Sequence, residues 1–285
     1  MNPFRKKEKQ LTREQLRRRV IVMLALAGLL CLFALVAPYL TPNDPNMPNA
    51  AYMNASPCKE FPLGADRYGR CVLSRVMIGA RTSIFSAVVL VFVSFVIGSL
   101  LGMLCGWYGG VLDTLIMRLA DIFLAFPQMV LAIAVAGVLG GSLLNAMIAL
   151  GITGWTLYAR LARTHTMALN HEPFILAAKM NGSSGLQIML RHILPNMIGP
   201  LTVNAATQIG TNMIGIAGLS FLGLGVVPPK AEWGSMISES RAYLQLAPWS
   251  VFVPAVAVIV TVMVFNYLGD AVRDYYDVSE AKGWL

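Results

Sequence analysis

Charge is scarce in this sequence. Only 13% of the 285 residues are charged and 56% are hydrophobic, whereas a soluble domain is roughly a quarter charged. This composition excludes a disordered chain or a basic nucleic-acid-binding arm, which need far more polar residues, and four cysteines are too few for a disulfide-rich scaffold. The remaining class is an integral membrane protein without a nucleic-acid partner.

Several kinds of chemistry are also absent. No lysine directly follows a glycine, which excludes the G-x-x-x-x-G-K-[ST] phosphate-binding loop. A membrane enzyme needs a nucleophile and a base together within its spans, but the three histidines all fall in one inner segment. We therefore expect no catalytic residue, no metal ligand and no cofactor in this chain.

The apolar stretches also lack the ionisable residues that a stand-alone secondary carrier places near the bilayer midplane. Charges near the third expected span gather at its inner end, where Arg118 and Asp121 are three residues apart and predict a local ion pair on one helical face. A carrier or channel that works alone stays as the alternative.

Long uncharged stretches predict an all-α, polytopic membrane protein. Residues 20–40 supply one span of ordinary length and are longer than the apolar part of a signal peptide. Residues 122–159 are too long for one crossing, and Gly140-Gly141-Ser142 predicts a turn that divides them into two. With the stretches 82–112, 193–229 and 242–269, the total is six transmembrane helices.

The basic residues set the orientation. Eight of them precede the first span, and this arrangement places fifteen on the inner side and seven on the outer side, as the positive-inside rule requires. The expected organisation is a cytoplasmic tail over 1–19, a first helix over 20–40, an extracytoplasmic loop over 41–81, a core of five helices over 82–270 and a cytoplasmic tail over 271–285.

Two cysteines, Cys58 and Cys71, lie in the long outer loop. The oxidising side of a membrane permits a disulfide between them, and free thiols are the equal alternative.

The inner segment 160–200 is long for a loop, and long ordered loops are usually functional. Pro173 can start a short helix that Asn181-Gly182 ends, and a second short helix over 186–192 is expected to stop before Pro195. The segment is either an ordinary linker along the headgroups or a docking element, since Ala177 and Ala178 permit close approach by another protein.

These residues carry a resemblance. Ala177-Ala178, Gly182 and Leu194-Pro195 have the spacing of the coupling loop of ABC importer permeases, although Leu176 and His192 stand where that pattern has Glu and Ile. The segments 64–81, 118–127 and 218–234 are similar to the peptide and nickel branch of the same family.

The resemblance implies a permease subunit in a bacterial cytoplasmic membrane, with both termini cytoplasmic. It would form half of a translocation pathway with a second, homologous permease subunit. Two ABC ATPase subunits would use ATP and Mg²⁺ and contact the coupling loop, and an extracytoplasmic solute-binding protein would deliver a peptide, glutathione, an opine, nickel or a metal chelate. At the outer end of the fifth span, Phe221, Leu222, Gly223 and Gly225 either serve helix packing or border the pathway.

Overall fold

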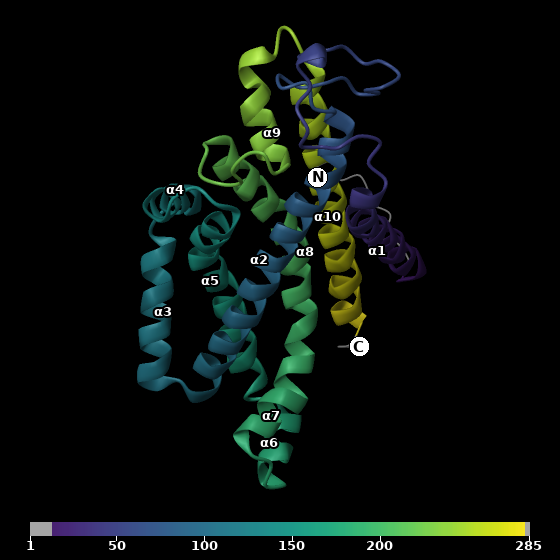
Figure 1. Cartoon of the computed structure of the whole chain (residues 1–285). Coiled ribbons are helices and arrows are strands. Elements are labelled where there is room, and N and C mark those ends of the chain that lie inside the picture. The colour runs from purple at the N-terminus through teal and green to yellow at the C-terminus, as the bar shows by residue number, and fades with distance from the viewer. Residues whose placement is uncertain (1–12, 283–285) are drawn as a thin grey trace, which may run out of the picture.

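The structure, a computed structural model, describes residues 13–282, and their regular structure is helical throughout (Figure 1). The basic residues Arg5, Lys6, Lys7 and Lys9 of the expected inner tail lie outside the described residues, as do positions 283–285. Five helices are long, namely α1 (Arg13–Val36), α2 (Val72–Tyr108), α5 (Leu143–Leu169), α8 (Leu194–Phe221) and α10 (Trp249–Lys282). The shorter ones are α3 (Gly110–Leu124), α4 (Gln128–Leu139), α6 (Pro173–Met180), α7 (Gly185–Ile188) and α9 (Trp233–Ser240).

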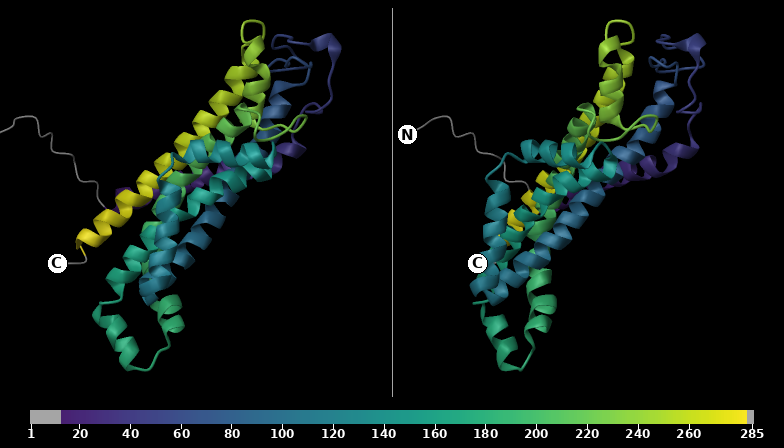
Figure 2. Two further views of the ribbon diagram at one scale, coloured as in Figure 1. Left: turned by 90° about the vertical axis from the view of Figure 1, so that its left-hand side faces the viewer. Right: turned by 60° about the vertical axis from the view of Figure 1, so that its left-hand side comes forward.

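Helix α2 is central to the bundle. It packs against α5 on one side and against α8 and α10 on the other, while α1 packs on α10 (Figure 1). The short helices α6 and α7 project at one end of the molecule, and α9 and the loop 37–71 form the other end in both views of Figure 2. In the expected topology the end with α6 and α7 is the inner one, and the end with α9 is the outer one.

Length and composition identify three helices that can cross a membrane: Glu14–Tyr39, Val72–Tyr108 and Trp249–Tyr276. A fourth crossing is added if the pair α3 and α4, bent by 90°, is one broken span. Helices α5 and α8 have 27 and 28 residues, which is about 40 Å at 1.5 Å per residue and exceeds a hydrocarbon core of roughly 30 Å. They meet the length for a span but lie outside the set identified by length and composition together.

The third expected span differs most from the structure. Instead of a straight helix over 122–140, the chain breaks between α3 and α4 at residues 125–127. Pro127 has no N–H to donate, and it disfavours a helical conformation at Phe126. The expected turn at Gly140 is present, with φ +85° at Gly140, and Ser142 caps α5 by accepting a hydrogen bond from the Asn145 N–H.

Two buried apolar clusters hold the bundle together. The larger one joins α2, α5 and α8 through residues such as Ile84, Leu150 and Ile216. The second lies nearer α6 and α7, and includes Met103 of α2 and Tyr158 of α5. The projecting loop is rooted in this second cluster.

Candidate functional site: the loop between α5 and α8

Helix α6 begins and ends on local sequence signals. Pro173 occupies its first turn, where the missing N–H costs nothing. At its other end, Gly182 has φ +78°, its N–H donates to the Lys179 carbonyl at 3.0 Å, and the Ser183 N–H donates to the Ala178 carbonyl at 3.1 Å. This pair of bonds is a Schellman motif, which requires a left-handed residue at Gly182. The predicted glycine stop is confirmed.

Helix α7 begins with a capping box. The Gln187 N–H donates to the Ser184 hydroxyl at 3.3 Å, and the Ser184 N–H donates to the Gln187 side chain at 3.0 Å. A single π-helical turn, Met189–Ile193, then connects α7 directly to α8.

The expectation that the second helix stops before Pro195 is therefore wrong. Pro195 lies in the first turn of α8, and the wider turn before it lets the Leu194 N–H bond the Met189 carbonyl five residues back. Proline interrupts an α-helix because it has no N–H to donate to the carbonyl four residues earlier. Here the wider π turn before Pro195 accommodates the missing hydrogen bond, so the helix continues. From α7 onward, the chain forms one continuous helical path into α8.

One face of the loop is buried. Ile175 and Ala178 of α6, and Ile188 at the end of α7, pack into the cluster that contains Met103 of α2. Gly185 lies against the indole of Trp107, where a Cβ would stand 2.9 Å from the ring nitrogen. The loop is therefore fixed to the inner end of α2.

The opposite face is apolar and exposed. Met180 is 89% exposed, and Phe174, Leu176, Leu186 and Leu190 are all large exposed hydrophobic residues. Of the two predicted alanines, Ala177 is on the exposed face and Ala178 on the buried one. The pair thus does not present one small-residue surface, and only Ala177 is available to a partner.

Two ion pairs join α3 to α5 above this loop. Arg163 donates to Asp113 through Nε at 2.5 Å and Nη2 at 2.6 Å, and Arg160 donates to Asp121 at 2.5 Å. The predicted local pair between Arg118 and Asp121 is wrong, because Asp121 faces the neighbouring helix α5. Sequence spacing within one helix could not show that neighbour.

The outer end of α8 closes with the same motif as α6. The Gly223 N–H donates to the Ser220 carbonyl at 3.0 Å and the Leu224 N–H to the Leu219 carbonyl at 2.9 Å, with φ +81° at Gly223. A Cβ at Gly225 would stand 2.0 Å from the Ser220 hydroxyl. Both glycines are thus required by the helix end itself.

The two larger residues of that segment differ in exposure. The Phe221 ring lies 5.3 Å from the Arg241 guanidinium, and its carbonyl accepts from Ser238 at 2.7 Å, whereas Leu222 is 54% exposed. Only Leu222 and Gly223 present surface that a pathway could use.

A buried charge cluster at the outer end was missed by the sequence reasoning. Arg70 donates to Asp66 at 2.7 Å and to Glu239 at 2.6 Å, and Arg75, 1% exposed, lies 3.5 Å from Glu239 and donates to the Pro45 and Pro229 carbonyls. Two cations and two anions thus hold the loop 37–71, α2 and α9 together. The sequence offered only a weak signal: three charged residues, Asp66, Arg70 and Arg75, lie close together in a charge-poor chain.

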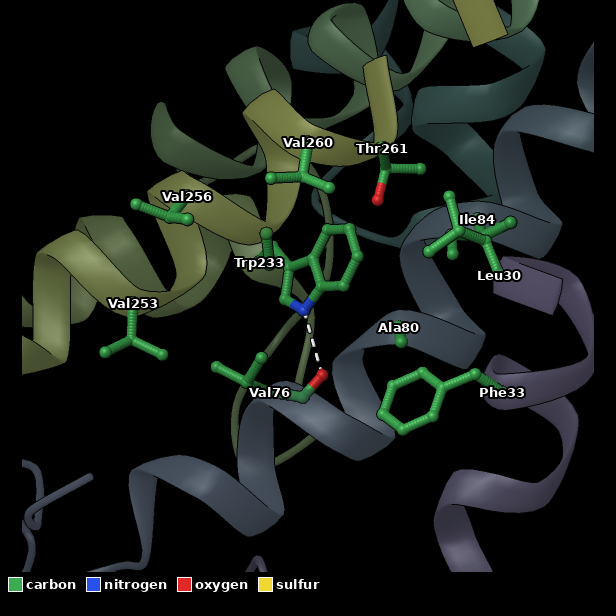
Figure 3. A pocket seen from close by; sticks show the side chains of 11 residues that line it. Leu30, Phe33, Val76, Ala80, Ile84, Trp233, Val253, Val256, Val260 and Thr261 are labelled. Atoms are coloured by element: carbon green, nitrogen blue, oxygen red, sulfur yellow. Dashed lines mark hydrogen bonds between the residues drawn. The ribbon is translucent and has the colours of Figure 1, made fainter. Parts of the chain in front are cut away.

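Helix α9 is attached beside this cluster. Glu232, 1% exposed, accepts hydrogen bonds from the Gly234 and Ser235 N–H groups and from the Ser83 hydroxyl of α2. Burial raises the pKa of Glu232, against these bonds that favour its charged form. Trp233 lines an apolar pocket of about 270 Å³ together with residues of α1, α2 and α10. Its Nε1 donates to the Val76 carbonyl at 2.9 Å, the bond drawn as a dashed line in Figure 3.

The structure has the second of the two alternatives for the outer cysteines. Both Cys58 and Cys71 are free thiols in it. Cys71 is 1% exposed and packs with Phe61 and Ala65, whereas Cys58 is exposed. Cys71 behaves as a small buried hydrophobe.

Comparisons with known proteins identify relatives of this chain. Residues 98–279 match the family described as binding-protein-dependent transport system inner membrane component. The chain is 39% identical to the dipeptide transport system permease protein of Alkalihalophilus pseudofirmus over 97% of this chain and 90% of that protein. It is also 39% identical to a glutathione transport system permease protein of Pectobacterium atrosepticum, over 93% of this chain and 89% of that one.

A solved structure of the MetNI methionine ABC transporter in an inward-facing conformation has the same fold. The TM-score is 0.50 at 21% identity, over 68% of this chain and 94% of that one. With the family match over most of the helical core, these likenesses make the assignment: the chain belongs to the family of inner-membrane components of binding-protein-dependent transport systems and is a permease subunit of an ABC importer.

Proposed function

We propose that this permease crosses the membrane six times with both termini in the cytoplasm. The crossings are α1, α2, the bent pair of α3 and α4, α5, α8 and α10. The lengths of α5 and α8 support this count, and so does the position of α6–α7 and α9 at opposite ends of the molecule (Figure 2). An even number of crossings keeps both termini on one side.

The native thiol Cys58 gives a direct test of that orientation, since it is exposed in the loop 37–71. After mild reduction, a membrane-impermeant maleimide should label Cys58 in intact spheroplasts. Ser183→Cys, in the turn between α6 and α7, should be labelled only after the membrane is opened. Labelling of Ser183→Cys in intact spheroplasts contradicts the orientation.

The loop 173–195 transmits ATP-driven movement from separate ATPase subunits into the helices. The observation that carries this proposal is the division of the loop into two faces: Ile175 and Ile188 are completely buried against α2, whereas Phe174 and Met180 are exposed. A rigid element that is apolar on its free face suits a partner's cleft. Its continuous helical connection to α8 would carry the movement inward.

The partners follow from the family. They are a second permease subunit that completes the pathway, two ATPase subunits that bind ATP and Mg²⁺, and an extracytoplasmic solute-binding protein. In this proposal ATP hydrolysis takes place in the ATPase subunits, and a partner must contact the loop differently in two states for the pathway to switch.

The substrate we propose is a small peptide. The relatives named above carry dipeptides or glutathione by their names, and both are small peptides. Metal chelates, including nickel, are the second option within the branch, and no group of three or more potential metal ligands occurs within residues 13–282. The substrate site in the binding protein decides between them.

Uptake of Ala-Ala tests both the substrate class and the energy source. The chain is expressed with its partner subunits and binding protein in cells that lack other peptide importers. Uptake should require the ATPase subunits and should disappear when their ATP site is inactivated. Uptake by this chain without ATPases would instead favour the stand-alone carrier or channel.

A further inference from the structure

A cavity of about 280 Å³ lies where the start of α4 meets α5 and α8. Most of its lining is apolar, from residues such as Met129, Leu150 and Ile214. Three polar side chains, Gln128, Thr211 and Asn212, also line it. Polar groups gathered in an apolar hollow are the usual form of a small-ligand site.

Asn212 is the least expected of the three. The residue is only 6% exposed, and its carboxamide makes no hydrogen bond to any group within residues 13–282. Its amide atoms are not among the fully buried, unpaired polar atoms of that part of the chain, and the residue lines the cavity. The Asn212 amide is therefore available to a ligand that enters the cavity.

The amino-terminal end of α4 opens on the same cavity, and its backbone donors are unused. The cap residue Pro127 supplies no side-chain acceptor, and the first N–H of α4 with an acceptor in the described chain is that of Leu131, 3.1 Å from the Pro127 carbonyl. The N–H groups of the three preceding residues are free, and they carry the partial positive charge of a helix start.

At the carboxyl-terminal end of α4, a side chain caps the free carbonyl groups. There the Asn145 side chain donates to the Leu139 carbonyl at 2.8 Å and to the Gly140 carbonyl at 2.9 Å. The first N–H groups of α4 have no such partner within residues 13–282, as is usual at a helix start, and they are open to a ligand in the cavity.

We propose that the start of α4, Gln128 and Asn212 bind the terminal carboxylate of a small peptide during its passage. The N–H groups at the start of α4 and the NH2 groups of the Gln128 and Asn212 carboxamides can all donate hydrogen bonds to a carboxylate. No lysine or arginine lines the cavity, so the carboxylate is held weakly enough to leave again. The inference rests on the proposed peptide substrate and adds where that substrate is contacted.

The test uses the complete transporter in proteoliposomes, with Ala-Ala and Ala-Ala amide as probes. The measured quantity is peptide transported per ATP hydrolysed, relative to wild type. For Asn212→Leu we expect about a tenfold fall for Ala-Ala, the size of one lost hydrogen bond to a charged group, and less than a twofold fall for the amide. Asn212→Asp should fall further for Ala-Ala, because it adds a like charge. Gly137→Ala, in α4 but outside the cavity lining and with nothing within 4 Å of the added Cβ, is the control and should stay within twofold.

Equal losses for the two probes, or no loss in either Asn212 variant, overturn the carboxylate site while the proposed function stands. If the wild-type transporter carries neither probe, the peptide proposal itself fails and this inference fails with it. Co-purification of the partner subunits shows whether each variant assembles. Gln128→Leu, at an exposed position, decides the question if the Asn212 variants do not assemble, with the same tenfold fall expected for Ala-Ala.

Discussion

Gly102 of α2 lies directly on the backbone of Ala159 of α5, so that a Cβ at Gly102 would stand 2.1 Å from the Ala159 carbonyl oxygen. The same contact recurs four residues away on either side, where a Cβ at Gly98 would lie 2.3 Å from the Trp155 carbonyl and one at Gly106 would lie 2.7 Å from the Arg163 carbonyl. Glycines at this spacing let two membrane helices approach closely. These glycines let α2 and α5 pack closely near the loop 173–195.

Substitution of Gly102 should separate these helices. We expect Gly102→Leu to lower the free energy of unfolding by about 1–3 kcal/mol or more, as overpacking does. The new side chain would collide with the Ala159 backbone, which cannot rotate away as a side chain could. The midpoint of thermal unfolding in detergent measures this. Gly137→Ala in α4, where a Cβ meets nothing within 4 Å, is the control and should be neutral. A neutral Gly102→Leu contradicts the contact.

The two ion pairs between α3 and α5 should differ in strength. The Asp113 and Arg163 side chains are 16% and 31% exposed, whereas those of Asp121 and Arg160 are about half exposed. Double-mutant cycles should give a coupling of about 1.5–3 kcal/mol for the first pair and about 0–1 kcal/mol for the second. Equal coupling energies would show that neither the partial burial nor the second hydrogen bond of the Arg163–Asp113 pair strengthens it.

The outer charge cluster should be sensitive to the loss of one anion. Glu239→Gln leaves the guanidinium groups of Arg70 and Arg75 with one carboxylate, that of Asp66, and should cost about 3–5 kcal/mol of unfolding free energy. Glu60→Gln, on the exposed surface of the same loop, serves as the control and should cost little. If the two variants are equally stable, the cluster does not hold the loop to α9.

Glu232 should make stability depend on pH. Burial raises its pKa above the ordinary value of 4.5, so the folded protein binds this proton more tightly than the unfolded chain does. The stabilising contribution of the neutral form is complete below the unfolded pKa and is lost as pH rises through the folded pKa. The test measures the thermal unfolding midpoint of the wild type and of Glu232→Gln at a series of pH values from 4 upward. The difference, wild type minus variant, should fall as the pH rises. A difference that rises with pH contradicts the sign.

Local signals in the sequence predicted local structure well. Pro173 and Gly182 mark the start and end of α6 because backbone conformation at these residue types depends little on distant contacts. The turn at Gly140 follows for the same reason. The family resemblance added the role of the loop, which composition and periodicity could not provide.

Features that depend on neighbours in space were not predicted. The ion-pair partner of Asp121 lies on another helix. A π turn accommodates Pro195, so the helix does not end there. Cys71 is buried in a small apolar cluster and does not contact Cys58. Of the outer cluster, Arg70 and Arg75 were counted for topology and lie with Asp66 in the segment 64–81 that carries the resemblance, but nothing in the sequence linked them to Glu239. Each of these needs the packing of helices far apart along the chain.

The central claim is that the loop carries ATP-driven movement, and Gly182 tests it most directly. A Cβ at Gly182 meets nothing within 4 Å, so a substitution acts only through its φ of +78°. Valine resists that conformation, whereas asparagine tolerates it. In the complete transporter, Ala-Ala uptake and substrate-stimulated ATP hydrolysis should become uncoupled in Gly182→Val and stay coupled in Gly182→Asn. Unchanged uptake and unchanged ATPase stimulation in Gly182→Val would contradict the claim.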